Sequence, residues 1–269
     1  MTGLDLRLLG GFAVADANGG TIRLSTRKAE ALLALLALPV GSSQARDRVC
    51  ALLWPEVPDT QARHSLRQTL FHMRKALAPA PAALASDARS LQLVAEHVRV
   101  DAAHFEACVA RGTREALVEA WRCYRGDLLE GVAVDEAPFE HWLRCERERL
   151  RQLFSEALTR LVAIDSEEAR YTEAIHACTR LLQLEPLREE AHRSMMRLLV
   201  QQGRRAAALQ HYRDLARMLR EELDAEPDHL TQQLHAEIER ASSPPPAAAA
   251  PSSVASASQQ AAPATTGRA

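Results

Sequence analysis

The stretch at residues 46–77 decides the fold and reads Arg46-Asp-Arg-Val-Cys-Ala-Leu-Leu-Trp-Pro-Glu56, followed after a turn by Ala62-Arg-His-Ser-Leu-Arg-Gln-Thr-Leu-Phe-His-Met-Arg-Lys-Ala-Leu77. Pro55 ends the first part, and Asp59 or Thr60 can cap the second. The stretch therefore predicts two short helices joined by a turn. This arrangement is typical of a helix-turn-helix, whose second helix lies in the major groove of DNA.

The second of these helices is predicted to be amphipathic. At about 100° per residue its apolar side chains fall within one narrow arc, which is the side that packs on a core. The opposite side is polar except for one phenylalanine and carries His64, Arg67, Gln68, Phe71 and Lys75, with Arg63 and Arg74 at its flanks. The apolar arc consists of Ala62, Leu66, Leu70, Met73 and Leu77.

Three of the exposed residue types can read base edges. An Arg at position 67 can bind O6 and N7 of guanine, Gln68 can pair with adenine, and Phe71 can contact a thymine methyl group. A phenylalanine on the polar side lowers solubility without helping folding unless a wing, a second domain or DNA covers it. We therefore expect a wing, a second domain or DNA to cover this face.

The remaining basic residues of the region suit phosphate contacts, which provide affinity and register but carry no sequence information. A solvated helix face would have a similar composition, because most charged stripes simply face water. The strand signals on both sides and the basic balance of the region favour DNA over that alternative. The full predicted set of DNA-binding residues is Arg46, Arg48, Arg63, His64, Arg67, Gln68, Phe71, Arg74 and Lys75.

Strand signals flank the predicted helices. Residues 4–14 alternate loosely in hydropathy, and the turn at 16–20 separates them from a short strand at 21–24, which together predict a small amino-terminal hairpin or sheet. A capped helix is predicted at 27–38. Residues 91–94 and 97–101 predict two further strands that close a hairpin. The order of these elements is that of a winged helix-turn-helix, and it defines a first domain at 1–101.

Beyond residue 101 the pattern is helical almost throughout and defines a second domain at 102–241. Helices are predicted at 105–122, 140–164, 167–184, 188–202 and 205–223. A faint repeat matches Ala174-Ile175, Cys178 and Leu181 with residues 34 positions later, which is the period of tetratricopeptide helix pairs. Generic helical hairpins of similar length would give the same match. The Ala/Pro/Ser-rich residues 242–269 predict a disordered tail or linker.

Charge divides along the same boundary. Residues 1–100 hold 12 Lys and Arg against 8 Asp and Glu, whereas residues 101–241 hold 20 against 27. A net charge of +4 favours a polyanion as partner of the first domain, and −7 disfavours one for the second. The five cysteines show no zinc-knuckle spacing and are interpreted as reduced thiols of a cytoplasmic protein. No signal peptide or membrane-spanning run is apparent.

Several motifs resemble a known family in order and spacing. The segments at 6–12, 25–29, 52–56, 62–67 and 73–77 resemble the OmpR-type winged helix of the antibiotic regulatory protein (SARP) family. Further motifs resemble the bacterial transcriptional activator domain that follows it: Arg125-Gly-Asp-Leu-Leu-Glu-Gly131, Trp142 with Glu146-Arg-Glu-Arg-Leu150, Pro186-Leu-Arg-Glu-Glu190, Gly203-Arg-Arg205 and Leu219-Arg-Glu-Glu-Leu-Asp-Ala-Glu-Pro227. The resemblance covers about residues 4–240.

This resemblance implies a bacterial transcriptional regulator, and an activator in particular. Its winged helix would bind double-stranded DNA at promoter repeats. Its tetratricopeptide-like domain would support homodimerisation on DNA or contact with RNA polymerase. The hairpin at 91–100 would be the wing, where Arg89 or Arg99 can reach a minor groove or the backbone. The chain departs from the family pattern in its short wing and in Gln44, which stands where an apolar residue is usual.

Two other functions compete with this interpretation. The sequence has no Gly-rich phosphate loop, no Gly-x-Ser-x-Gly and no His-Glu-x-x-His, so we expect neither an enzyme nor a cofactor. The histidines His64 and His72 diverge on the helix, and no metal site is predicted. The alternative to a DNA-binding regulator is a tetratricopeptide-like protein-interaction module with a vestigial winged helix.

Overall fold

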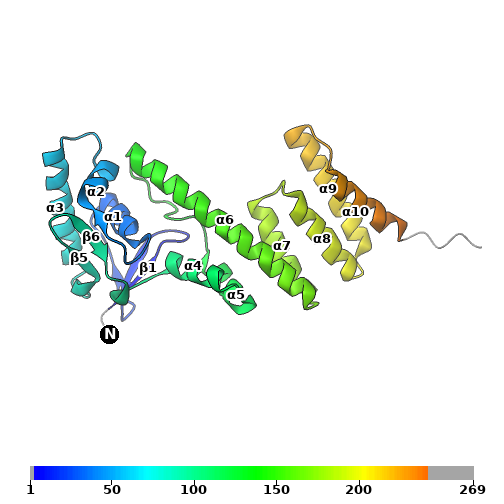
Figure 1. Ribbon diagram of the computed structural model, residues 1–269, viewed down its shortest axis with the longest axis horizontal. Coiled ribbons are helices and arrows are strands. Elements are labelled where there is room, and N and C mark those ends of the chain that lie inside the picture. The colour runs from blue at the N-terminus through cyan, green and yellow to red at the C-terminus, as the bar shows by residue number, and fades with distance from the viewer. Residues whose placement is uncertain (1–2, 242–269) are drawn as a thin grey trace, which may run out of the picture.

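The computed structural model describes residues 3–241 and confirms an α+β winged helix followed by an all-α tetratricopeptide-like part (Figure 1). The predicted tail at 242–269 lies outside these residues. None of the helices between residues 3 and 241 has the length and the apolar run that a membrane span needs. The first part contains β1 (Leu4–Arg7), β2 (Ala13–Asp16), β3 (Thr21–Ile22), α1 (Arg27–Ala37), β4 (Gln44–Ala45), α2 (Arg46–Leu53), α3 (Asp59–Ala76), β5 (Leu84–Ser86), β6 (Ser90–Leu93) and β7 (Val98–Val100).

Two small sheets accompany the three helices of this part. The first has the order β3-β2-β1-β7, in which β1 runs antiparallel to β2 and parallel to β7. The second has the order β4-β6-β5 and is antiparallel throughout. Helix α1 lies at the centre, since every residue from Ala31 to Ala37 is buried. Thr26 caps this helix by accepting a hydrogen bond from the Ala29 backbone N–H.

The predicted hairpin at 91–100 is wrong. Its first strand is β6, but β6 pairs with β5, while β7 pairs with β1 in the other sheet. The wing is therefore the β5–β6 hairpin, with its turn at residues 87–89. The prediction overlooked β5 because its three residues, Leu84-Ala-Ser86, follow two prolines and carry no hydropathy alternation long enough to identify a strand.

The second part consists of α4 (Asp101–Arg111), α5 (Arg114–Cys123), α6 (Ala137–Glu167), α7 (Tyr171–Leu184), α8 (Glu189–Gln201), α9 (Arg205–Leu223) and α10 (His229–Arg240). The predicted single helix at 105–122 is two helices, because Gly112 adopts a left-handed φ of 66° and Thr113 caps the next helix. Helix α10 was not predicted, although Asp228 caps it at the Thr231 N–H. The signal was present, since an Asp after a proline is a typical helix start.

The 34-residue repeat corresponds to equivalent positions of two helix pairs, α7–α8 and α9–α10. Ala174 and Leu181 are buried in α7, and their counterparts Ala208 and Leu215 are buried in α9. Small and large side chains thus alternate at the same places of successive helices, as the period predicts. Figure 1 shows the long α6 extending from beside α2 to the first of these helix pairs, α7–α8.

The segment at 125–131, which follows α5, joins the two parts. The Leu129 N–H donates to the Leu8 carbonyl at 2.8 Å, and the Gly10 N–H donates to the Asp127 carbonyl at 3.0 Å. Leu128 and Leu129 are fully buried, in one hydrophobic core that extends across residue 101. The side chain of Asp101 accepts hydrogen bonds from the backbone N–H groups of Leu8 and Leu9, at 2.8 and 3.1 Å.

We expect Gly10→Ala to destabilise the protein more than Gly19→Ala does. Both glycines have a left-handed φ, of 82° and 81°, so both substitutions strain the backbone. Only at Gly10 would the added methyl group also meet the joining segment, at 3.0 Å from Arg125 Cβ. Denaturant unfolding should place Gly10→Ala about 1–3 kcal/mol below Gly19→Ala. Equal free energies of unfolding would show that this close contact is unimportant.

The buried His192 and the half-buried His211 form a pair between α8 and α9. The His192 ring lies 2.9 Å from that of His211, measured from Nδ1 to Nε2, and its Nε2 lies 2.8 Å from the Pro186 carbonyl oxygen. His192 donates to that carbonyl, so its Nδ1 is free to accept from His211. Burial, with the neighbouring imidazole second, lowers the pKa of His211 to about 4, and burial also lowers the pKa of His192.

Stability should therefore fall in acid. Both histidines are neutral in the folded protein. Their contribution to the free energy of unfolding is complete above the pKa of a histidine in the unfolded chain, about 6.5, and is lost as the pH falls from there towards 4. Glu189, near His192, and Asp214, near His211, oppose this effect but are the smaller influences. We expect the free energy of unfolding to drop by about 1–3 kcal/mol over that window.

His211→Gln, which still donates to His192, should flatten this dependence. The matched change at the exposed His176 should leave the acid dependence as it is in the wild type. The prediction fails if His211→Gln and the wild type lose stability in parallel.

Candidate nucleic-acid interface

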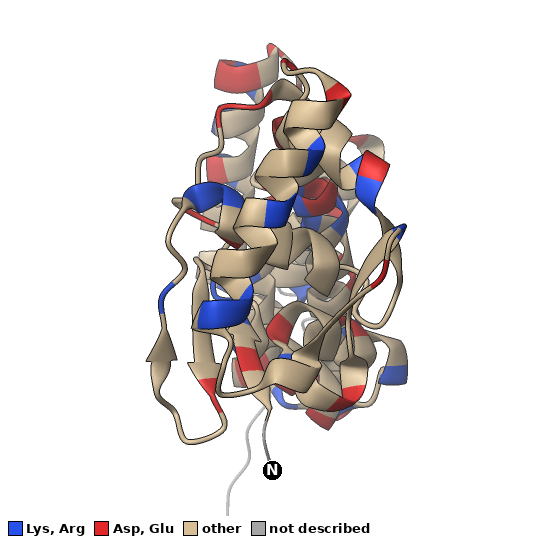
Figure 2. Ribbon diagram, turned by 90° about the vertical axis from the view of Figure 1, so that its left-hand side faces the viewer, with Lys and Arg blue, Asp and Glu red and all other residues tan. Residues whose placement is uncertain are grey.

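Helix α3 presents the two faces predicted for it. Its buried side chains are Ala62, Leu66, Leu70 and Met73, and Leu77 directly after the helix is also buried. Phe71 is 66% exposed, the most exposed large apolar side chain in the described residues. Figure 2 shows Lys and Arg at successive turns along the helix that faces the viewer. All seven predicted α3 contacts are exposed, namely Arg63, His64, Arg67, Gln68, Phe71, Arg74 and Lys75.

Some of the predicted contacts are held by neighbouring groups. Arg63 forms an ion pair with Asp47 at 3.0 Å, and Arg74 donates to the hydroxyl group of Ser86 in the wing. The Nε of Arg46 donates to the Asp87 carbonyl at 2.9 Å. These arginines are thereby directed by α2 and by the wing, and their exposed ends stay on the same side of the molecule.

Other predicted contacts carry no such restraint. Among residues 3–241, no side-chain hydrogen bond or ion pair involves His64, Arg67, Gln68 or Lys75. Their donors and acceptors face solvent, so a ligand can use all of them without first breaking an internal bond. This is the condition under which Arg and Gln read base edges most readily.

A cleft of about 480 Å³ lies between the start of α2, the first half of α3 and the wing turn. Four arginines from these three elements line it: Arg46, Arg63, Arg67 and Arg89. Asp47 is the one acidic residue in its lining. Convergent positive charges of this kind suit an anion, and a phosphate oxygen can accept from several guanidinium groups at once.

The wing turn is stiffened by Asp87. Its carboxylate accepts hydrogen bonds from the backbone N–H groups of Arg89 and Ser90, both at 2.7 Å, and from the Ser90 hydroxyl at 2.8 Å. The hydrogen bond from Arg89 is the largest of the causes that lower the pKa of this carboxyl group. The Arg46 N–H donates to the Arg89 carbonyl and so ties the turn to α2. Arg89 thus belongs with the interface.

Two details of the predicted interface differ from expectation. Arg99, proposed as a wing residue, lies on β7 beside Asp5 and Asp16, in the sheet that does not form the wing. Arg48 is exposed as predicted, but it donates to the buried Gln44 side chain at 2.8 Å. This bond explains why a polar residue is stable at position 44, since its amide also donates to Ser42 at 3.2 Å.

The fold and this surface define a winged-helix protein with an attached tetratricopeptide-like helical domain. Residues 90–239 match the family described as the bacterial transcriptional activator domain. The chain belongs to this family of SARP-type transcriptional regulators.

Two relatives agree with this assignment, and a solved structure shares the fold. AfsR of Streptomyces coelicolor, a regulatory protein, is 29% identical over 237 residues, which cover 83% of this chain but only 23% of AfsR. MoaR1 of Mycobacterium tuberculosis, a transcriptional regulatory protein, is 26% identical over 244 residues, or 82% of this chain and 75% of MoaR1. The structure of Mycobacterium tuberculosis EmbR with a low-affinity phosphopeptide shares the fold, with a TM-score of 0.70 at 23% identity over 90% of this chain and 66% of EmbR.

Proposed function

We propose that this regulator binds double-stranded DNA in a sequence-specific way and activates transcription from promoters that carry repeated sites. Helix α3 enters the major groove, and the wing follows the adjacent backbone. The observation that carries the proposal is the exposed face of α3, where unrestrained base-reading side chains lie beside a cleft lined by four arginines. Membership of a regulator family supports the same conclusion.

The division of roles within the interface follows from its hydrogen bonds. Arg46, Arg63 and Arg74 are directed by protein groups and contact phosphates, which fixes the register of the helix on the duplex. Arg67 and Gln68 are free and contact bases. Phe71, with its ring edge against His72, supplies an apolar surface for a thymine methyl group.

The helical part has a different role in this proposal. Its net charge of −7 repels phosphate, so it adds no affinity for DNA by itself. We propose that it either joins two chains on a promoter repeat or contacts RNA polymerase. Its rigid attachment through the segment at 125–131 would set the spacing between two reading helices.

We expect Arg67→Ala and Lys75→Ala to weaken DNA binding in different ways. The full-length chain is first used to select a site from randomised duplexes, and affinities are then measured on that site and on single-base variants across a range of salt concentrations. Arg67→Ala should cost about 1–3 kcal/mol and remove the preference at one base pair. Lys75→Ala should weaken all sequences alike and reduce the salt slope by about one counterion.

Arg217→Ala is the control for these substitutions, because it removes an exposed arginine from α9, far along the chain from α3. It should leave binding unchanged. If both α3 variants lost the same affinity for every DNA sequence, Arg67 would be excluded as a residue that recognises a base. If the wild type does not bind DNA in a salt-dependent way, the proposal is overturned and a protein-interaction module is favoured.

A second prediction addresses the helical part. The full-length chain should bind a direct repeat of the selected site at least about tenfold more tightly than a single site, because the second chain binds at a high effective concentration. Mass measurement of the complex should give two chains per repeat. Independent binding to the two sites, with equal affinity, would contradict dimerisation on DNA and leave contact with RNA polymerase as the role of this part.

A further inference from the structure

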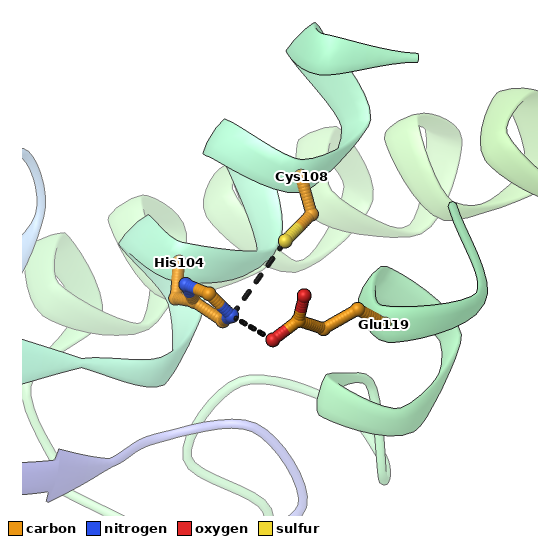
Figure 3. Close-up of side chains that lie close together, drawn as sticks. All are labelled: His104, Cys108 and Glu119. Atoms are coloured by element: carbon orange, nitrogen blue, oxygen red, sulfur yellow. Dashed lines mark hydrogen bonds and ion pairs between the residues drawn. The ribbon is translucent and has the colours of Figure 1, made fainter. Parts of the chain in front are cut away.

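A cluster of three metal-binding residue types lies on α4 and α5, outside the DNA interface. His104 Nε2 is 2.8 Å from Glu119 Oε1 and 3.6 Å from Cys108 Sγ. The three donor atoms all lie within 4.8 Å of one another. Figure 3 shows the side chains pointing towards one another from the two helices. No other group of three such residues is as close in the part of the chain that the structure describes.

The local fold explains why these residues meet. His104 and Cys108 are four positions apart, so they share one face of α4. The chain reverses at Gly112, whose left-handed backbone ends α4, and α5 then returns alongside with Glu119 facing the pair. Cys108 is fully buried, whereas His104 and Glu119 are each about half exposed, at 49% and 50%. The cluster is therefore open to solvent on one side only.

The distances suit a tetrahedral zinc ion. With Zn–S of about 2.3 Å and Zn–N of about 2.0–2.1 Å, the S···N edge of a tetrahedron is about 3.6 Å. The observed separation between Cys108 Sγ and His104 Nε2 is 3.6 Å. The corresponding N···O edge is about 3.3 Å, so Glu119 needs to shift by about half an ångström. Its exposed side chain can do so without disturbing the core.

The cluster already holds a positive charge. Arg111 Nη2 lies 2.9 Å from Cys108 Sγ and 3.8 Å from a Glu119 carboxylate oxygen. The guanidinium group thus places a positive charge beside both the sulfur atom and the carboxylate. The Arg111 side chain is 57% exposed, so it can withdraw into solvent when a divalent ion takes its place.

We propose that His104, Cys108 and Glu119 bind Zn²⁺, with water as the fourth ligand. Imidazole nitrogen, thiolate and carboxylate oxygen are the three donor types that zinc takes in proteins, and a thiolate disfavours Mg²⁺ and Ca²⁺. Binding releases the Cys108 proton and links α4 to α5. The site is independent of the proposed DNA contacts, since none of its residues belongs to them.

Cobalt provides a direct test, because Co²⁺ occupies zinc sites and is coloured. The full-length chain, kept reduced, is titrated with Co²⁺ alone. We expect one equivalent to produce a sulfur-to-cobalt charge-transfer band in the near ultraviolet and the visible bands of tetrahedral cobalt, both removed by Zn²⁺. Cys108→Ser should abolish the charge-transfer band. His104→Gln and Glu119→Gln should each weaken Zn²⁺ binding at least about tenfold.

The chain offers a matched control on α6. His141 and Cys145 have the same spacing, with Cys145 Sγ 3.8 Å from His141 Nε2, but the described residues provide no third donor to form a cluster there. Cys145→Ser should leave both cobalt bands intact. Loss of the bands in this variant, their persistence in Cys108→Ser, or their absence from the wild type would overturn the proposal.

A thermal measurement keeps the test decisive if the buried Cys108→Ser variant fails to fold. Zn²⁺ should raise the melting temperature of the wild type and of Cys145→Ser, because a ligand that binds only the native state stabilises it. The surface variant Glu119→Gln should show a smaller rise. Equal stabilisation of all three proteins would show that zinc binds elsewhere and overturn the proposal.

Discussion

The docking of the segment at 125–131 against β1 is the constraint on which the rest of the structure depends. This segment supplies backbone partners to Leu8 and Gly10 and buries Leu128 and Leu129. It is fixed from the other side by Arg147, whose guanidinium donates to the Leu128 and Leu129 carbonyls at 2.8 and 3.0 Å. Backbone hydrogen bonds in a shared core permit little relative motion, so the winged helix and α6 behave as one framework.

An ion pair and a hydrogen bond at the edge of this contact act on α1. Lys28 lies 2.6 Å from Glu136 and over the ring of Trp54, and Arg27 donates to the Gly131 carbonyl at 3.1 Å. Helix α1 is the buried centre of the winged helix, on which α2 and α3 pack. The direction of α3 is therefore set partly by Gly131 and Glu136, which lie more than a hundred positions after the α1 residues that they contact. The hydrophobic core likewise crosses residue 101, the boundary that the order of the predicted elements suggested.

Features with a local cause were predictable from the sequence, whereas features with a distant cause were not. The amphipathic face of α3 follows from periodicity within one helix, and the repeated positions Ala174 and Ala208 follow from the 34-residue period of successive helix pairs. The pairing of β7 with β1 depends on contacts about 95 residues apart, and nothing in residues 91–100 distinguishes it from a hairpin. The cluster at Cys108 was missed for a similar reason, because its third donor comes from another helix. The roles of Arg67 and its neighbours on DNA remain predictions.

The interface combines restrained and unrestrained side chains in a way that matches two kinds of contact. Phosphates occupy fixed positions along any duplex. Side chains that are already held in place therefore lose less conformational entropy when they bind phosphates, as Arg46 is held by Asp87 and Arg63 by Asp47. Base edges differ from site to site. The Arg67 side chain can adjust to them because it has no internal hydrogen bond to break. In the proposed DNA complex, the restrained arginines at the rim would fix the position of α3 on the backbone, and the free side chains at its centre would contact the bases.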